Sequence, residues 1–187
     1  KKLADAFTPL GKAMNTEYAN QNAYDCIQVH GGSGFMKDYP CERIYRDSRI
    51  TNIYEGTTQL QVVAAIRHVL TGTYLTQIKE YQAETFHPEL DGLKVRLAKM
   101  TEIYEQLVPV VADTKDNEYI DFQARRLVEC AGHITLGYLL LLDTNRNPEE
   151  FRRSAEVYIT YGEAEVNKIR DFIQEFSIEN LGYYKQI

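Results

Sequence analysis

Tryptophan is absent from this 187-residue sequence, and cysteine occurs only three times, at Cys26, Cys41 and Cys130. The cysteines are widely spaced and form no C-x-x-C pair, so their spacing indicates neither a disulfide framework nor a zinc site. We therefore expect a reducing compartment, and the sequence nominates no metal ligand.

An excess of basic residues is also missing. Lys and Arg number 21 against 27 Asp and Glu, which gives a formal net charge of -6. A chain with this balance is poorly suited to neutralising phosphate groups, so nucleic acid and anionic membrane surfaces are disfavoured as partners.

Long hydrophobic runs are lacking as well. The longest, around Tyr138 to Leu142, is much shorter than the roughly 20 residues that a membrane span requires. No charged-then-apolar leader opens the chain. We expect a cytoplasmic protein that does not enter a membrane.

Helical periodicity is what the sequence does contain, and strand signals are nearly absent. Apolar residues recur three and four apart, which is typical of amphipathic helices packed in a bundle. The first half predicts helices over about residues 3–27, 43–47 and 58–70, and the second half predicts three long helices within 93–107, 120–141 and 155–176. We therefore expect an all-α fold, with domains at 1–72 and 89–187 joined by a linker at 73–88.

Two local features of the first domain suggest a binding or catalytic site. The glycine-rich segment after His30 would let an anion such as a pyrophosphate approach the backbone closely, although a plain glycine turn that ends a helix explains the pattern better on the residues alone. Glu55 directly precedes a helix that Thr58 and Gln61 begin with the spacing of a capping box. The simplest explanation for Glu55 is that its negative charge interacts favourably with the positive, N-terminal end of that helix.

A longer segment, which contains both features, favours the functional explanation of the glycine segment and Glu55 over the structural one. The segment from Gln28 to Arg67 reads QVHGGSGFMKDYPCERIYRDSRITNIYEGTTQLQVVAAIR. It resembles the C-terminal signature of acyl-CoA dehydrogenases, in which Q-[IV]-H-G-G-x-G-F is followed by R-D-x-x-I and then by I-Y-E-G-T-x-x-[IL]-Q. The match is ordered and free of gaps over some forty residues.

This resemblance implies a flavoenzyme of fatty acid metabolism. In that family the glutamate of I-Y-E-G-T, here Glu55, removes the α-proton of an acyl-CoA while FAD takes a hydride from the β-carbon. Such a base must be desolvated and the enolate that it forms must be stabilised. Gly56 would leave room for the thioester, and Tyr54 would pack beside the substrate, although a core aromatic role is at least as good an explanation for Tyr54.

The resemblance also implies the cofactor contacts and the partners. The glycine-rich segment would contact FAD, commonly one held by a neighbouring subunit, and the start of the helix after Glu55 would also touch FAD while keeping its cap. The implied FAD-binding residues are Gln28, His30, Gly31, Gly32, Thr57, Thr58 and Gln59. The implied partners are an acyl-CoA substrate, an electron-transfer flavoprotein as electron acceptor, and further copies of the chain in a homodimer or homotetramer.

Residues 89–187 resemble the extra helical domain of larger family members, for which we expect a role in packing or assembly. Because the family's other domains are missing from this sequence, we expect residues 1–187 alone to be inactive. Two further hypotheses remain open: a non-catalytic relative that binds a protein partner, and an α-helical assembly module in which the glycine loop and Glu55 are structural.

Overall fold

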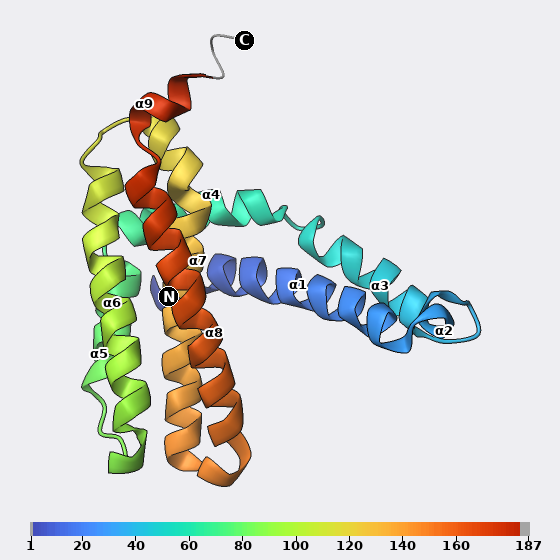
Figure 1. The fold of residues 1–187 in the computed structure, drawn as a ribbon. Coiled ribbons are helices and arrows are strands. Elements are labelled where there is room, and N and C mark those ends of the chain that lie inside the picture. Colours follow the sequence, from blue (N-terminus) through green and yellow to red (C-terminus); the bar gives the residue numbers. More distant parts are fainter. Residues whose placement is uncertain (1, 184–187) are drawn as a thin grey trace. The chain divides into compact units, whose positions relative to one another are not determined.

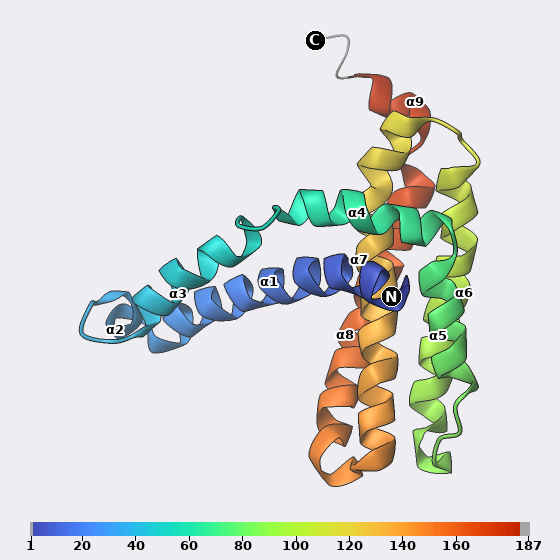
Figure 2. The ribbon, with the colours of Figure 1, turned by 180° about the vertical axis from the view of Figure 1, so that it is seen from behind.

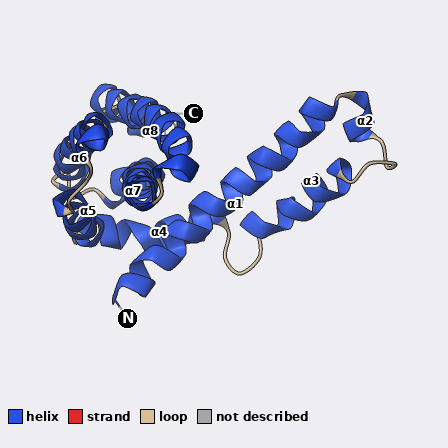
Figure 3. Cartoon of the chain, turned by 90° about the horizontal axis from the view of Figure 1, so that it is seen from below, coloured by secondary structure: helices blue, strands red, loops and turns tan. Residues whose placement is uncertain are grey.

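The computed structural model describes residues 2–183, and every regular element among them is helical, which confirms the all-α prediction (Figure 3). The chain divides into two compact units, residues 1–65 and residues 66–187. The division falls inside helix α4 (Thr58–Leu70). Each unit is described by itself below.

The first unit is built around one long helix. Helix α1 (Lys2–His30) leads into the short helix α2 (Gly32–Phe35), and α3 (Cys41–Arg49) then runs back beside α1 in both views (Figures 1 and 2). A 3-10 helix (Ile50–Asn52) and a turn connect α3 to α4. Alanines, with few larger residues, supply the buried positions on α1, and small side chains let helices approach closely. The buried apolar residues of α1 are Ala6, Leu10, Ala13, Met14 and Ala23.

The second unit is a helical bundle with α7 (Asn117–Arg146) at its centre. Figure 3 shows α5, α6 and α8 around α7, and all three pack against it. Their bounds are Thr73–Ala83 for α5, Asp91–Ala112 for α6, Pro148–Glu175 for α8 and Ile178–Leu181 for the terminal α9, with a 3-10 helix at Pro88–Leu90.

Large apolar side chains fill the centre of this bundle. They occupy the apolar positions, three and four residues apart, that predicted α6, α7 and α8. The periodicity therefore identified the core residues as well as the helices. Fully buried members include Leu97, Met100, Tyr104, Leu107, Leu127, Ile134, Leu141, Ile159 and Ile173. The Tyr119 hydroxyl on α7 donates to the Phe176 carbonyl oxygen at 2.7 Å, which ties the start of α7 to the end of its antiparallel neighbour α8.

Two helix boundaries differ from the sequence prediction. The stretch 73–88, expected as a linker, contains α5, whose residues Tyr74 and Ile78 are fully buried one helical turn apart. Helix α6, predicted within 93–107, continues through Pro109 and ends at Ala112. Asn147 precedes α8, and its side chain donates to the Glu150 carboxylate at 2.9 Å without capping the helix.

Helix α7 is the one described helix that is long and apolar enough to cross a membrane. Of its most apolar stretch, 67% is buried inside the molecule. The core helix of a bundle passes the same length and composition test, so its place at the centre of the second unit accounts for its hydropathy.

Candidate functional site

The turn that carries Glu55 has an unusual backbone. Glu55 has a φ of 51° and Gly56 has a φ of 92°, so two successive residues have the positive φ values that favour glycine. A non-glycine residue pays roughly 1 kcal/mol for that conformation. The Glu55 side chain is exposed in this chain. The turn therefore projects a carboxylate outward from a strained position.

Lys12 of α1 fixes this turn. Its ammonium group donates to the carbonyl oxygen of Tyr54 and, at 2.5 Å, to that of Gly56, the residues on either side of Glu55. It also lies 5.1 Å from the centre of the Tyr54 ring, within cation–π range. One charged group thus satisfies both carbonyls that flank Glu55.

Gln61 holds the same turn from the helix that follows it. Its amide nitrogen donates to the carbonyl oxygens of Glu55 at 3.2 Å and Gly56 at 3.4 Å. A Cβ atom added to Gly56 would come within 2.8 Å of that nitrogen. The positive φ therefore favours glycine at position 56, and a larger residue there would also displace the Gln61 amide from the turn.

Glu17 holds the segments on both sides of the turn. Its carboxylate accepts from the Thr58 hydroxyl at 2.6 Å and from the Asn52 side-chain amide at 3.3 Å. Glu17 and Asn52 also border an open polar hollow of about 370 Å³ beside α1 and α3. The sequence alone did not identify Lys12 or Glu17. Their local pattern gives no sign that they contact residues some forty positions later in the chain.

The predicted capping box at the start of α4 is wrong. The Thr57 hydroxyl, not that of Thr58, accepts from a first-turn amide, that of Leu60 at 3.4 Å. The Thr58 hydroxyl bonds Glu17 instead, and Gln61 turns back to the carbonyls of the Glu55 turn. The helix begins at Thr58 as expected, but a different residue caps it.

The glycine-rich segment forms a tight reversal between α1 and α2. Gly31 has a φ of 58°, and its amide donates to the Gln28 carbonyl at 3.1 Å, while the Gly34 amide donates to the Gly31 carbonyl at 3.0 Å. A Cβ on Gly34 would lie 2.6 Å from the Ile27 carbonyl oxygen, so this glycine permits α2 to fold against α1. In contrast, a Cβ at Gly31 or Gly32 would meet nothing within 4 Å.

The predicted cofactor residues form two groups rather than one. Gln28, His30, Gly31 and Gly32 are exposed around the end of α1, whereas the second group starts α4 beside the turn that Lys12 holds. Sixteen residues of α1 separate Lys12 from Gln28, about 24 Å at 1.5 Å per residue. The second group consists of Thr57, Thr58 and Gln59.

Apolar side chains are unusually exposed around both groups. A monomer rarely leaves many large apolar residues in water unless they meet another surface or a ligand. Val29 is 84% exposed and Phe35 is 76% exposed, beside the glycine segment. Others in this unit include Met36, Ile44, Ile50, Ile53, Tyr54, Leu60 and Val63.

Two family models match consecutive parts of the chain. "Acyl-CoA dehydrogenase, C-terminal domain" matches residues 1–70, and "Acyl-CoA dehydrogenase C terminal" matches residues 70–181. Together they extend over nearly all of the sequence, and they meet within α4.

Curated relatives match about a third of the chain. An acyl-CoA dehydrogenase of Bacillus subtilis is 42% identical over 64 residues, which is 34% of this chain and 17% of the relative. An acryloyl-CoA reductase (NADH) of Anaerotignum propionicum is 47% identical over 74 residues, 36% of this chain and 19% of the relative. The chain thus spans less than a fifth of the length of these proteins.

Two solved structures are similar to the chain. An acyl-CoA dehydrogenase family protein from Porphyromonas gingivalis is 49% identical with a TM-score of 0.58, and the match covers 61% of this chain and 98% of that one. An acyl-CoA dehydrogenase from Bacillus anthracis, solved with FAD, has a TM-score of 0.69 at 23% identity and covers 88% of this chain and 32% of that one. At 23% identity, the similarity to the Bacillus anthracis structure shows a shared fold and nothing further.

Proposed function

This chain belongs to the acyl-CoA dehydrogenase family, and we propose on that basis that Glu55 is the general base of a flavin-dependent acyl-CoA dehydrogenase. The observation that carries the proposal is the left-handed turn at Glu55, which Lys12 and Gln61 hold in place within the segment that resembles the family signature. Strain of this kind persists where the surroundings fix it, and it is concentrated at functional sites.

In the proposed reaction, the Glu55 carboxylate takes the α-proton of an acyl thioester. A bound FAD would supply the hydride acceptor for the β-hydrogen, and the product would be a 2-enoyl-CoA. Gly56 presents no side chain toward the thioester beside the base. Lys12 and Glu17 act as positioning residues that do not contact the reacting atoms. Lys12 holds the backbone on both sides of Glu55, and Glu17 holds the side chains of Asn52 and Thr58.

The described residues fit a flavin dinucleotide in two places. Gly31 and Gly32 border open space, so a pyrophosphate could lie against their backbone. The start of the 13-residue helix α4, with Thr57, Thr58 and Gln59, offers first-turn amides to an anion or polar ring. His30 and Gln28 would contribute side-chain contacts beside the glycines.

The distance between the two groups bears on the assembly. About 24 Å of α1 separates Lys12, which holds the turn before α4, from Gln28 in the glycine group. We assign the glycine segment to a cofactor held by a neighbouring copy and the start of α4 to a cofactor beside Glu55. That arrangement requires a homodimer or homotetramer, and an electron-transfer flavoprotein would reoxidise the flavin.

The exposure of Glu55 is compatible with this role only in a larger protein. The curated relatives are more than five times longer than the matched segment. The exposed apolar residues of the first unit are suited to contact with the protein, cofactor and acyl chain that would desolvate the base. Residues 1–187 alone are proposed to be inactive, and the complete enzyme to be cytoplasmic.

The direction of the reaction is a separate question. One relative is named for the reduction of acryloyl-CoA. The same carboxylate that removes an α-proton can return it, by microscopic reversibility. We propose the oxidative direction, and an assay with both saturated and unsaturated thioesters decides between the two.

The test uses the full-length flavin-loaded protein under anaerobic conditions. Addition of an acyl-CoA series should bleach the flavin absorbance of the wild-type protein. Glu55→Gln should slow this bleaching by at least about 100-fold, the scale of lost general-base catalysis, while the flavin content stays unchanged. Glu175→Gln, which neutralises an exposed carboxylate at the end of α8, is the control.

Normal bleaching by Glu55→Gln would show that another group is the base. A full-length protein that binds no flavin would instead favour a non-catalytic scaffold, used for protein binding or assembly.

A further inference from the structure

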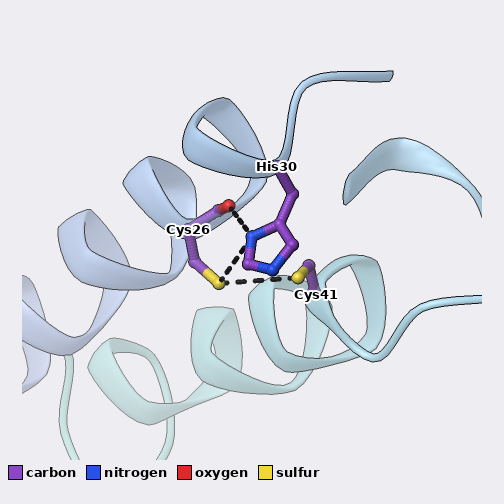
Figure 4. A group of neighbouring side chains, drawn as sticks. All are labelled: Cys26, His30 and Cys41. Carbon is purple, nitrogen blue, oxygen red and sulfur yellow. Dashed lines mark hydrogen bonds between the residues drawn. The ribbon is translucent and has the colours of Figure 1, made fainter. Parts of the chain in front are cut away.

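Three side chains of the first unit converge between the end of α1 and the start of α3. Cys26 and His30 lie one turn apart on α1, and Cys41 is the first residue of α3 (Figure 4). Their potential ligand atoms all lie within 4.8 Å of one another. Residues 31–40, including the glycine segment, form the connection between the two helices.

The separation of the two sulfurs is that of a tetrahedral metal site. The Cys26 and Cys41 sulfurs are 3.5 Å apart, and a ring nitrogen of His30 lies within 4.8 Å of both. Ligands placed tetrahedrally at about 2.3 Å for sulfur and about 2.0 Å for nitrogen are roughly 3.5 to 3.8 Å apart. A metal ion would therefore fit without a large movement of either helix. A disulfide, in contrast, would bring the sulfurs to about 2.05 Å.

The imidazole of His30 is also held as metal-binding histidines usually are. Its Nδ1 lies 2.9 Å from the carbonyl oxygen of Cys26. With the proton on Nδ1 donated to that carbonyl, Nε2 carries the free lone pair. A backbone carbonyl that fixes the tautomer in this way is the common outer-shell partner of a histidine ligand.

The site combines a sheltered side with an accessible one. Cys41 is buried and Cys26 is half-buried, whereas His30 is exposed. An ion could enter from the histidine side, and water could occupy the coordination position that the protein leaves open.

We propose that Cys26, His30 and Cys41 bind one thiophilic divalent metal ion, for which Zn²⁺ is the best match, with water as the fourth ligand. Two thiolates and one imidazole are the donors that zinc prefers, whereas magnesium and calcium take oxygen ligands. Each thiol releases its proton to solvent when the ion binds, and no oxidation takes place.

Metal binding would fasten the end of α1 to the start of α3. The metal ion would thereby link the two ends of the connection that contains Gly31 and Gly32. The inference rests on the geometry of the three side chains and is independent of the reaction proposed for Glu55. It assigns the His30 imidazole to the metal ion in place of the FAD contact that the resemblance implies.

The test is a titration of the purified, fully reduced protein with Co²⁺, followed by competition with Zn²⁺. One Co²⁺ per chain should bind and give sulfur-to-cobalt charge-transfer absorption together with the intense visible bands of tetrahedral cobalt. Zn²⁺ should displace it. Cys26→Ala and Cys41→Ala should each abolish the charge-transfer band or weaken affinity by more than the roughly 10- to 100-fold that loss of an outer-shell partner costs.

Cys130→Ala is the matched control, because Cys130 is a buried cysteine of the second unit. It should retain the full cobalt spectrum and stoichiometry. Circular dichroism of each variant separates loss of the site from loss of the fold, and His30→Gln provides a third variant at an exposed position.

Three results would overturn the proposal. They are absence of cobalt–sulfur absorption in the reduced wild-type protein, retention of that absorption in both Cys26→Ala and Cys41→Ala, and a mass spectrum in which these cysteines form a disulfide whose reduction yields no metal binding.

Discussion

Lys12 donates to the carbonyl oxygen of Gly56 at 2.5 Å, so a residue near the start of the chain fixes the backbone next to Glu55. Its second acceptor is the carbonyl of Tyr54, on the other side of the same glutamate. The orientation of the proposed base thus depends on a tertiary contact more than forty residues long. A change at Lys12 should therefore affect turnover without touching the reacting atoms.

Lys12→Met in the full-length enzyme should lower kcat by about tenfold and leave flavin binding intact. Hydrogen bonds from a charged donor contribute roughly 1.5 to 3 kcal/mol, and the lower end applies because Lys12 is only half-buried. Steady-state kinetics measures the effect. Lys12→Arg should recover part of the rate, and Lys99→Met, which removes an exposed charge from α6, should leave kcat unchanged. Equal losses in Lys12→Met and Lys99→Met would argue against a positioning role.

Gly56→Ala should lower the free energy of unfolding of the first unit by about 1 to 2 kcal/mol, because it combines an unfavourable φ with crowding against Gln61. Denaturant unfolding measures this change. Gly72→Ala is the comparison, since Gly72 also has a positive φ, of 71°, but a Cβ there would meet nothing within 4 Å. Adding Gln61→Ala should relieve part of the Gly56→Ala loss. If Gly72→Ala proved equally costly, crowding by Gln61 would not matter.

His133 should make the second unit sensitive to mild acid. Burial lowers the pKa of His133 from its ordinary value, against the opposing attraction of Glu129 and Glu165, while the nearby Lys168 also lowers it. Between the lowered folded pKa and the unfolded pKa of about 6.5, the unfolded chain holds more protons. The free energy of unfolding should therefore fall as pH drops through about 6.5 and stay level for this group above it.

Thermal unfolding across this pH range measures the dependence, and His133→Gln should flatten it. His87→Gln replaces an exposed histidine of the same unit and should keep the wild-type pH dependence. An unchanged slope in His133→Gln would remove His133 as the source.

Tyr104→Phe should leave the second unit as stable as the wild type or slightly more stable. The Tyr104 hydroxyl is buried without a hydrogen-bond partner, and burial raises the pKa of this phenol well above its ordinary value, so the group stays neutral. Removing an unsatisfied buried hydroxyl recovers its desolvation cost. Leu97→Ala, at an equally buried position, should instead cost about 2 to 5 kcal/mol. Denaturant unfolding compares the two, and a loss above about 1 kcal/mol in Tyr104→Phe would reveal a partner for the hydroxyl.

The helices were predictable where the apolar stripe is strong. Helix α4 has the expected bounds of Thr58–Leu70, and α7 and α8 follow their predicted periodicity. Helix α5 was missed because polar residues dilute its stripe, although Tyr74 and Ile78 at a four-residue spacing were a usable signal. Helix α6 extends past the predicted residue 107 because Pro109, near the helix end, removes few hydrogen bonds, and the buried side chains of Leu107 and Val111 keep this turn packed.

The site was predictable only in part. The resemblance located Glu55 and the glycine segment, but the residues that hold them are set by tertiary contacts. Lys12 and Glu17 belong to this class, since their spacing on α1 has no local signature. The cluster of Cys26, His30 and Cys41 escaped detection for the same reason, because its third member enters from another helix.

The positive φ of Glu55 destabilises the folded chain, whereas the proposed reaction requires the carboxylate at the same position. Glycine would adopt a φ of 51° without steric penalty, so Glu55→Gly should relax the turn while it removes the carboxylate. A library selected only for resistance to unfolding would tend to discard this glutamate, and a library selected for turnover would have to retain it.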